Sequence, residues 1–219
     1  MRHFLSLALF AAVLAPAAAH ADTITIGSYA GSSSSTLANT VLTYDASALD
    51  SDFPSTTART GTAVAYQHPA YAAPVTGTQY VSVDANGGGG AGDVYFTTTF
   101  TLASLENYTG TISFLVDNRV GITLNGVSIL STDDPNNFAS FGQITSISLP
   151  SADLQAGLNT LVFDVYNAPN PGAPNQNPLA LDFGATLTGT AVTPEPSSLV
   201  LLGTGALSMA GAVRRRFNK

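Results

Sequence analysis

The sequence predicts an all-β protein, an antiparallel β-sandwich, and two observations carry that prediction. β-branched and aromatic residues alternate with polar residues over short segments, which is the pattern of half-buried strands. Turn-forming residues separate these segments, with 20 glycines and 12 prolines in the chain. Because helical periodicity is nearly absent between the two termini, we expect no crossover helices, and antiparallel pairing in two packed sheets follows.

The N-terminal part of the folded region contains few clear strands. Residues 23–27 alternate Thr and Ile and predict a first strand. A long connection punctuated by prolines follows, and residues 80–84 predict another short strand. Residues 86–92 contain five glycines, which excludes regular structure. We expect a loop there that lines a binding face, supplies carbonyls to a cation, or only connects two strands.

The C-terminal part alternates strongly. Phe96, Thr98 and Phe100 fall on one face of a long strand at residues 94–102. Asn125-Gly126 is a strong two-residue hairpin signal, because a type I′ turn needs positive φ at both positions. Further strands are expected at residues 111–116, 120–124, 127–130, 144–149, 160–167 and 179–187, with one helical turn at residues 151–156.

Residues 1–21 have the three parts of a signal peptide. Arg2 supplies the positive start, residues 4–14 the apolar core, and Ala19-His20-Ala21 the small-x-small cleavage pattern. A transmembrane helix is the alternative, but the apolar core is too short to span a bilayer. We therefore expect export, with cleavage after Ala21.

Residues 193–219 form a second terminal segment with three parts of its own. Pro194-Glu195-Pro196 makes a stiff, extended break, because each proline fixes its own φ and disfavours helix at the residue before it. Residues 197–213 are uncharged and mostly apolar, and the basic run Arg214-Arg215-Arg216 follows. As a helix, the apolar run reaches about 26 Å against about 30 Å of hydrocarbon, so we expect a marginal transmembrane helix with its basic end on the cytoplasmic side.

This tail resembles the PEP-CTERM sorting signal of Gram-negative bacteria, since the Pro-Glu-Pro motif, the glycine-dotted apolar run and the basic end all match. The resemblance implies recognition by an exosortase, a membrane enzyme thought to cut near the motif. It also implies a precursor anchored transiently in the inner membrane, and release to the cell surface or to an exopolysaccharide matrix. The alternative is an ordinary C-terminal membrane anchor.

Between the terminal segments lies an acidic body, residues 22–192, which is long enough for one domain. Of the 14 acidic residues only Glu195 lies outside this body, whereas five of the 7 basic residues do. The body therefore has 13 carboxylates against Arg59 and Arg119, for a net charge of −11. Such a surface repels phosphate backbones, which excludes nucleic-acid binding and disfavours anionic membrane surfaces. The chain has no cysteine, so a disulfide framework is excluded as well.

Three stretches of the body resemble a galactose-binding-like jelly roll, the fold of many carbohydrate-binding modules. They are Val116-Asp117-Asn118 leading to Leu124-Asn125-Gly126, residues 154–163 with Gly157-Leu158-Asn159, and Asn177-Pro178-Leu179. The same order is familiar from other PEP-CTERM surface proteins. The resemblance implies the fold, and because this fold hosts many functions, a function carried over from it is an analogy.

Asp117, Asn118 and Asp93 are candidate calcium ligands, because calcium prefers oxygen atoms of Asp, Asn and backbone carbonyls. Asp133-Asp134 with Asn136 forms another such cluster. Many jelly rolls of this type carry one structural calcium, and the resemblance implies one here. The alternative is that these residues only shape turns, which Asp and Asn favour in any case.

Little in the composition of the body supports catalysis. His68 is its only histidine, so a Ser/His/Asp triad would have to run through a proline-flanked, weakly patterned segment. Zinc sites built from His and Cys are excluded by count. Paired carboxylates hydrolyse glycosides, but the carboxylates of this body lie mainly in predicted loops. We therefore expect no enzyme.

The expected function is that of a non-enzymatic exported surface or matrix protein, with a structural or interaction role in exopolysaccharide or biofilm. The alternative is a carbohydrate-binding module for a surface polysaccharide, and a glycoside hydrolase comes third. Sugar sites usually offer an exposed aromatic platform. An exposed aromatic pair beside the Gly-rich loop would favour the module, and a cleft holding two carboxylates would favour the hydrolase. The candidate platform residues are Tyr66, Tyr71, Tyr80, Tyr95, Tyr108 and Tyr166.

Overall fold

The computed structural model divides into a body, Ala21–Val192, and a separate unit that holds the C-terminal segment. The signal peptide with Ala19 and Ala21 lies outside the residues that the structure describes, as do Pro194 and Glu195. The described residues are 22–29, 41–50, 57–88, 90–103, 106–132, 141–172, 177–191 and 196–217.

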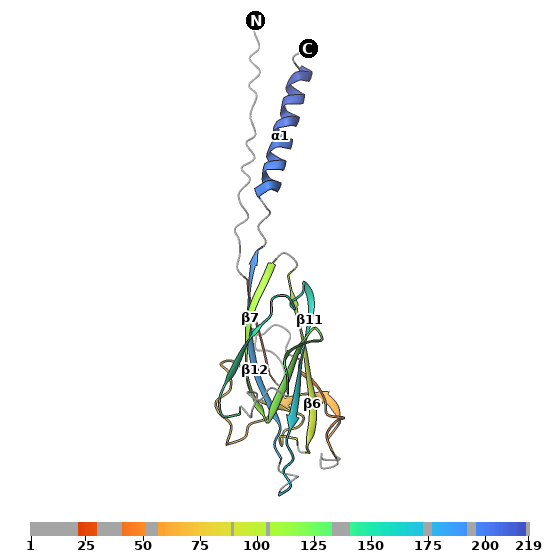
Figure 1. Ribbon diagram of the computed structural model, residues 1–219, viewed down its shortest axis with the longest axis vertical. Helices are drawn as coiled ribbons and strands as arrows, with labels where there is room; N and C mark the ends of the chain where they lie inside the picture. The colour runs from red at the N-terminus through yellow and green to blue at the C-terminus, as the bar shows by residue number, and fades with distance from the viewer. Residues whose placement is uncertain are drawn as a thin grey trace. The chain divides into compact units, whose positions relative to one another are not determined.

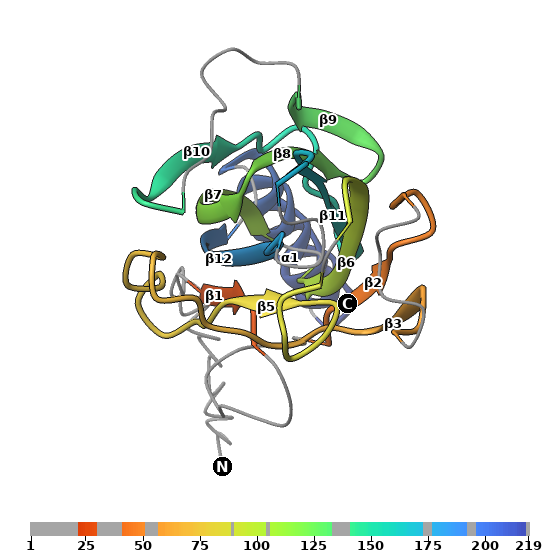
Figure 2. The same cartoon turned by 90° about the horizontal axis from the view of Figure 1, so that it is seen from below.

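The body is a sandwich of two antiparallel sheets, which Figures 1 and 2 show from two directions. Six described strands form each sheet, and the predicted antiparallel β-sandwich is therefore confirmed. Sheet A runs β10 (Thr145–Leu149), β7 (Glu106–Asp117), β12 (Ala180–Ala191), β5 (Val81–Ser82) and β4 (Val64–Ala65), and β1 (Asp22–Gly27) also pairs with β12. Sheet B runs β3 (Thr60–Thr62), β2 (Thr43–Asp45), β6 (Gly92–Leu102), β11 (Gly157–Asn167), β8 (Arg119–Leu124) and β9 (Val127–Leu130).

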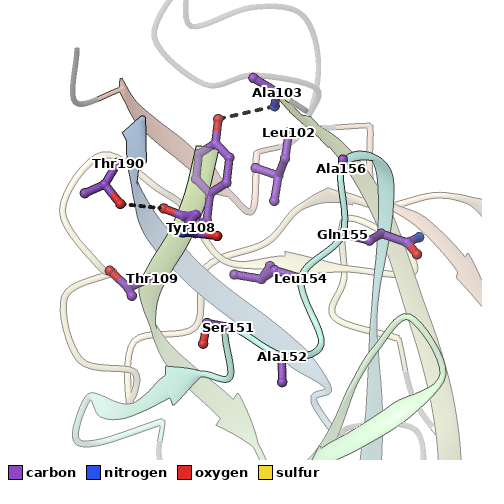
Figure 3. Close-up of a pocket in the computed structure, with 11 residues that line it drawn as sticks. Leu102, Ala103, Tyr108, Thr109, Ser151, Ala152, Leu154, Gln155, Ala156 and Thr190 are labelled. Atoms are coloured by element: carbon purple, nitrogen blue, oxygen red, sulfur yellow. Dashed lines mark hydrogen bonds between the residues drawn. The ribbon is translucent and has the colours of Figure 1, made fainter. Parts of the chain in front are cut away.

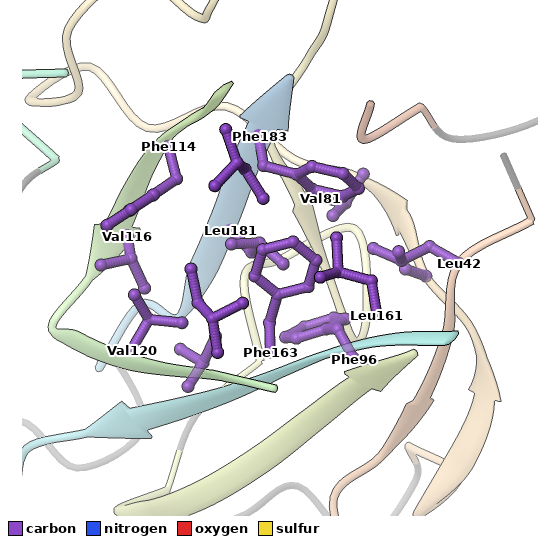
Figure 4. Packing of buried hydrophobic residues seen from close by; sticks show 14 of the residues in the cluster. Leu42, Val81, Phe96, Phe114, Val116, Val120, Leu161, Phe163, Leu181 and Phe183 are labelled. Atoms are coloured by element: carbon purple, nitrogen blue, oxygen red, sulfur yellow. The ribbon is translucent and has the colours of Figure 1, made fainter. Parts of the chain in front are cut away.

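Apolar residues from both sheets alternate into the space between them and form the core (Figure 4). Phe163 of β11 and Phe183 of β12 meet there with their ring centroids 4.3 Å apart, and both are fully buried. Phe96, Thr98 and Phe100 point into the same core, as predicted. Because burial of one such aromatic side chain contributes about 1.5–3 kcal/mol, this core supplies most of the favourable free energy of folding.

The hairpin between β8 and β9 confirms the turn prediction. Asn125 and Gly126 have φ values of 52° and 82°, the positive values that a type I′ turn requires. The side-chain oxygen of Asn125 also accepts the Thr160 N–H at 2.8 Å. The turn is thereby tied to the neighbouring strand β11.

The helical turn expected at residues 151–156 was wrong. The Asp153 N–H donates to the Pro150 carbonyl at 3.1 Å, and the chain is irregular from there to β11. The buried side chain of Asn159 accepts the Gln155 N–H at 2.9 Å and donates to the Gln155 carbonyl at 2.7 Å. It thereby takes backbone groups that a helix would have used.

The connection between β4 and β5, residues 66–80, covers the outer face of sheet A, and we call it the covering segment. Tyr71 and Tyr80 lie against Leu115 of β7 and Ala180 of β12, and the four residues form a second, smaller apolar cluster. The sequence predicted no such cover, because the segment has no strand or helix period. The covering segment thereby places the rings of Tyr71 and Tyr80 against sheet A.

A buried carboxylate fastens this covering segment to the sheet. Asp182 of β12 is fully buried, and it accepts hydrogen bonds from the Ser28 hydroxyl at 2.9 Å, the Thr78 hydroxyl at 2.5 Å and the Val75 N–H at 2.7 Å. Burial raises the pKa of Asp182, and these hydrogen bonds oppose the rise. The three donors come from chain segments that the sequence gives no reason to bring together.

The C-terminal segment forms one helix, α1 (Pro196–Phe217), which ends in Arg214, Arg215 and Arg216 as expected. Among the described residues, no helix is both long and apolar enough to cross a membrane. This finding does not support the expected transmembrane helix: the uncharged run at residues 197–213 is shorter than the roughly 20 apolar residues of a typical span.

Candidate functional site

The candidate site lies at the end of the sandwich where β7 and β11 end and β6 and β8 begin. The Gly-rich stretch between β5 and β6, whose described residues 84–88 and 90–92 we call the glycine loop, runs across this end. Its Gly87 carbonyl accepts the Leu179 N–H at 2.8 Å, which ties the loop to the start of β12. The covering segment of sheet A passes beside it.

Three rings of the covering segment form what we call the aromatic patch: Tyr66, His68 and Tyr71. The ring centroids of Tyr66 and Tyr71 are 6.0 Å apart, and those of His68 and Tyr71 are 5.2 Å apart. Tyr71 is buried, whereas Tyr66 and His68 are half-buried and reach the surface. Below them, Tyr71 lies 4.8 Å from Tyr80 and 5.5 Å from Phe141 between ring centroids. The patch is thus a partly exposed pair of rings on a packed aromatic floor.

The aromatic patch lies directly beside the glycine loop. A Cβ atom added to Gly87 would lie 2.3 Å from Cζ of Tyr66, so the Tyr66 ring occupies the space that any side chain at this position would need. Gly87 also has a φ of 92°, a value that favours glycine. The loop therefore needs glycine here both for its backbone conformation and to admit the ring.

Asp84 organises the glycine loop. Its Oδ1 accepts the N–H groups of Asn86 at 2.8 Å and Gly88 at 3.0 Å, and its Oδ2 accepts the Thr57 hydroxyl at 2.8 Å. We did not single out Asp84 from the sequence, although an Asp two residues before Asn-Gly is a turn signal that could have identified it. Asp84 also acts electrostatically on the aromatic patch. Burial raises the pKa of the Tyr66 hydroxyl, and the negative charges of Asp117 and Asp84 raise it further.

Asp117 lies under the patch. Its Oδ2 accepts the Tyr71 hydroxyl at 2.8 Å, and its Oδ1 accepts the Asn118 side-chain amide at 2.5 Å. Burial raises the pKa of Asp117, and the Tyr71 hydrogen bond and the nearby His68 oppose the rise. The Nδ1 atom of His68 accepts the Ala70 N–H at 3.2 Å, so this nitrogen has a local structural partner.

Calcium binding by Asp117, Asn118 and Asp93 stays a prediction, and the structure shows which partners these residues have. Both oxygens of Asp117 already accept hydrogen bonds, and Oδ1 of Asn118 accepts the Ala168 N–H at 2.7 Å. Asp93 lies on β6 of the other sheet, opposite Tyr166. Over the described ranges, no three His, Cys, Asp or Glu side chains come close enough to hold a metal ion. Asp133 and Asp134 lie outside those ranges.

A small pocket of about 240 Å³ opens beyond the glycine loop. The Gly90 carbonyl at its edge accepts the side-chain amides of Asn167 at 2.6 Å and Asn177 at 3.3 Å. The Oδ1 atom of the fully buried Asn167 accepts no hydrogen bond from the described residues. The lining residues are Asp50, Gly90, Ala91, Pro169, Asn170, Pro171 and Asn177.

A second pocket, of about 290 Å³, lies at the opposite end of the sandwich (Figure 3). The Tyr108 hydroxyl there accepts the Ala103 N–H at 3.2 Å, and Leu154 lines the wall. Tyr108 is buried and none of the lining residues is charged. This pocket therefore offers neither an exposed ring nor a strong polar anchor.

The tyrosines predicted as platform residues thus divide into three groups. Tyr71, Tyr80 and Tyr108 are buried and serve packing. Tyr66 reaches the surface at the aromatic patch, beside the Gly-rich loop where such a ring was expected to indicate carbohydrate binding. Tyr95 and Tyr166 lie on the outer face of sheet B.

Comparison with known proteins identifies the tail. Residues 192–216 match the PEP-CTERM protein-sorting motif. The sorting signal expected there is thereby confirmed, and it marks an exported, exosortase-sorted precursor. No curated protein matches the chain.

Several solved structures are similar to this chain. One is a β-(1,4)-mannanase of Podospora anserina (GH26-CBM35), with 20% identity and a TM-score of 0.33. The match covers 71% of this chain and 29% of the mannanase, so this chain spans less than a third of the length of that enzyme. A CBM35 of Paenibacillus barcinonensis is 19% identical, with a TM-score of 0.31 and coverage of 68% of this chain and 98% of the module. A family 35 carbohydrate-binding module of Clostridium thermocellum is 16% identical, with a TM-score of 0.32 and coverage of 57% and 98%.

Proposed function

We propose, starting from the PEP-CTERM sorting motif that this chain carries, that it is a non-enzymatic surface protein whose β-sandwich binds polysaccharide of the extracellular matrix. The motif accounts for delivery. The aromatic patch accounts for what the delivered body does. In exopolysaccharide or biofilm, the protein would then either cross-link polysaccharide chains or attach itself to them.

The observation that carries the binding proposal is the half-exposed ring pair Tyr66 and His68 beside Gly87. Sugar rings stack their C–H faces on aromatic side chains, and nearby polar groups orient their hydroxyls. The pocket lined by Asp50, Asn170 and Asn177 supplies such groups beside the glycine loop.

The carboxylates near the patch support binding rather than hydrolysis. A glycosidase needs one carboxylic acid and one carboxylate free to act on the two sides of a glycosidic bond. Asp84 is held by two backbone N–H groups and the Thr57 hydroxyl, and Asp117 by Tyr71 and Asn118. Both therefore serve to build the loop end, and we propose that the protein is no enzyme.

The test is binding of the full-length chain to a glycan array and to matrix polysaccharides, compared among the wild type, Tyr66→Ala and a control. Val127→Ala is the control, because it removes an apolar side chain that is 47% exposed on the β9 hairpin. We expect saturable binding to one glycan class, weakened about tenfold by Tyr66→Ala and unchanged by Val127→Ala. Absence of binding at high protein concentration would leave a structural matrix protein and refute the binding proposal.

A further inference from the structure

The pocket of about 240 Å³ beyond the glycine loop lies within reach of the aromatic patch. Gly87 of the loop lies against the Tyr66 ring, and Gly90 lines the pocket. Because three residues of fully extended chain span at most about 11 Å, the two points of the loop are close together. A sugar chain of a few units that rests on Tyr66 therefore also reaches the pocket.

Hydrogen bonds fix one wall of this pocket to the glycine loop. The Asp50 N–H donates to the Ala91 carbonyl at 2.9 Å, and Oδ1 of Asp50 accepts the Ala91 N–H at 3.1 Å. Arg59 holds the segment that carries Asp50, since its Nη1 donates to the Leu49 carbonyl at 2.9 Å. The pocket is therefore formed before a ligand binds, and little free energy is lost in ordering it.

Asn177 brings an acceptor oxygen to the lining of the pocket. Its side chain is only 9% exposed. Its Nδ2 donates to the Ala168 carbonyl at 2.8 Å and to the Gly90 carbonyl at 3.3 Å, which fixes the orientation of the amide. Its Oδ1 accepts no hydrogen bond from any residue that the structure describes. Since a largely buried acceptor without a donor is unfavourable, a ligand that brings an N–H or O–H group here would be stabilised.

The outer lining of the pocket combines apolar surface with a donor. Pro169 and Pro171 are exposed and contribute two apolar rings. Asn170 lies between them in the sequence, is exposed as well, and carries a side-chain amide that donates N–H groups. The pocket thus offers an acceptor, a donor and apolar surface to one ligand group.

We propose that this pocket receives the acetamido group of an N-acetylated amino sugar while a neighbouring unit of the same chain stacks on Tyr66. The inference rests on the proposed function and names the class of glycan that the site selects. The acetamido N–H would donate to Oδ1 of Asn177, and its carbonyl would accept from Nδ2 of Asn170. Its methyl group would pack on Pro169 and Pro171, as apolar groups do in pockets with a few polar anchors.

Other sugar substituents match fewer features of the pocket. A hydroxyl group would satisfy the polar side chains but would leave Pro169 and Pro171 without an apolar partner. A free amino group would bring donors, but neither the carbonyl that Asn170 can bind nor the methyl group. An acidic group would be repelled by the carboxylate of Asp50 at the pocket wall.

The experiment titrates the full-length chain with three hexasaccharides of the same linkage, made of N-acetylglucosamine, glucosamine or glucose, and follows binding by calorimetry. The three sugars differ only in the substituent at one carbon of each unit. Asn170→Asp removes the proposed donor and keeps the shape of the side chain. Asn107→Asp is the matched control, because it makes the same change at an exposed position beside the pocket at the opposite end of the sandwich. Tyr66→Ala reports separately on the aromatic patch.

We expect the N-acetylglucosamine hexasaccharide to bind about tenfold more tightly than the other two sugars, and Asn170→Asp to weaken its binding about threefold to tenfold. Asn107→Asp should leave all affinities unchanged, and Tyr66→Ala should weaken all three sugars by a similar factor. Thermal unfolding of the two Asn variants checks that both are folded, and the preference of the wild type decides if Asn170→Asp is not.

Equal binding of the three sugars, tightest binding of the glucosamine sugar, or a preference that survives Asn170→Asp would each overturn the inference. The proposed function would stand in those cases if Tyr66→Ala still weakens binding. A preference that depends on Asn170 but not on Tyr66 would support the pocket and refute the aromatic patch. If the wild type binds none of the three sugars, the inference fails together with the binding proposal on which it rests.

Discussion

The Tyr71 hydroxyl donates a hydrogen bond of 2.8 Å to Oδ2 of Asp117, joining the covering segment to the last residue of β7. Both side chains are buried, with 8% and 5% exposed. This contact holds the floor of the aromatic patch against sheet A. It also gives a buried carboxylate one of its two donors, so it matters for stability as well as for the site.

Tyr71→Phe is expected to destabilise the body by about 1–3 kcal/mol, because it leaves a buried carboxylate oxygen without its donor. The free energy of unfolding, measured by urea denaturation at neutral pH, is the readout. Tyr66→Phe is the matched control: it removes a hydroxyl from a half-exposed ring and should change stability by less than about 0.5 kcal/mol. Equal stability of Tyr71→Phe and the wild type would show that this hydrogen bond does not hold the segment.

The C-terminal half of the fold was predicted well, because alternating strands and tight turns there are encoded by residues that are neighbours in the sequence. Alternation placed Phe96, Thr98 and Phe100 on one face of a strand, and all three are buried in the core. The Asn125-Gly126 pair determined a hairpin through backbone conformation alone. Such signals need no knowledge of distant residues.

The covering segment and the site could not be predicted in the same way, because they depend on partners far apart in the chain. Asp182 binds Ser28 and Thr78, which are separated from it by 154 and 104 positions. Tyr66 was a candidate platform residue, but only the structure shows that its ring lies over Gly87. Asp117 and Asn118 were expected to make a turn or bind calcium; Asn118 connects β7 to β8, and both residues form hydrogen bonds that the sequence did not predict.

Gly87→Ala should weaken glycan binding by displacing the Tyr66 ring. The new Cβ would lie 2.3 Å from Cζ of that ring, and the positive φ adds a backbone cost of about 1–2 kcal/mol. Gly126→Ala is the control, since Gly126 also has a positive φ but no atom lies within 4 Å of its would-be Cβ. Gly87→Ala should lose more stability than Gly126→Ala because the ring must also move, and only Gly87→Ala should lose binding, by about tenfold.

Binding titrations and thermal unfolding of the two glycine variants separate these effects. A Gly87→Ala protein that binds glycans as the wild type does would mean that Tyr66 is no platform. If Gly126→Ala loses binding equally, the effect comes from general destabilisation and the patch assignment fails. Only a difference between the two variants supports the site.

Asp164 should make the body more stable as the pH falls. Its pKa rises from the usual 3.8 to about 6 in the folded chain, mainly through burial. The folded state therefore takes up a proton before the unfolded state does, so the free energy of unfolding increases between neutral pH and about pH 4 and is lost as the pH rises through 6. The raised pKa values of Asp117 and Asp182 act in the same direction.

Asp164→Asn removes this contribution. The variant should be more stable than the wild type at neutral pH, by less than about 2 kcal/mol because solvent screens the half-buried carboxylate, and its stability should depend less on pH between about 4 and 6. Urea denaturation across this range, with Asp22→Asn as the control for charge removal, measures both effects. Parallel profiles for Asp164→Asn and the wild type would show that Asp164 titrates as an ordinary surface carboxylate.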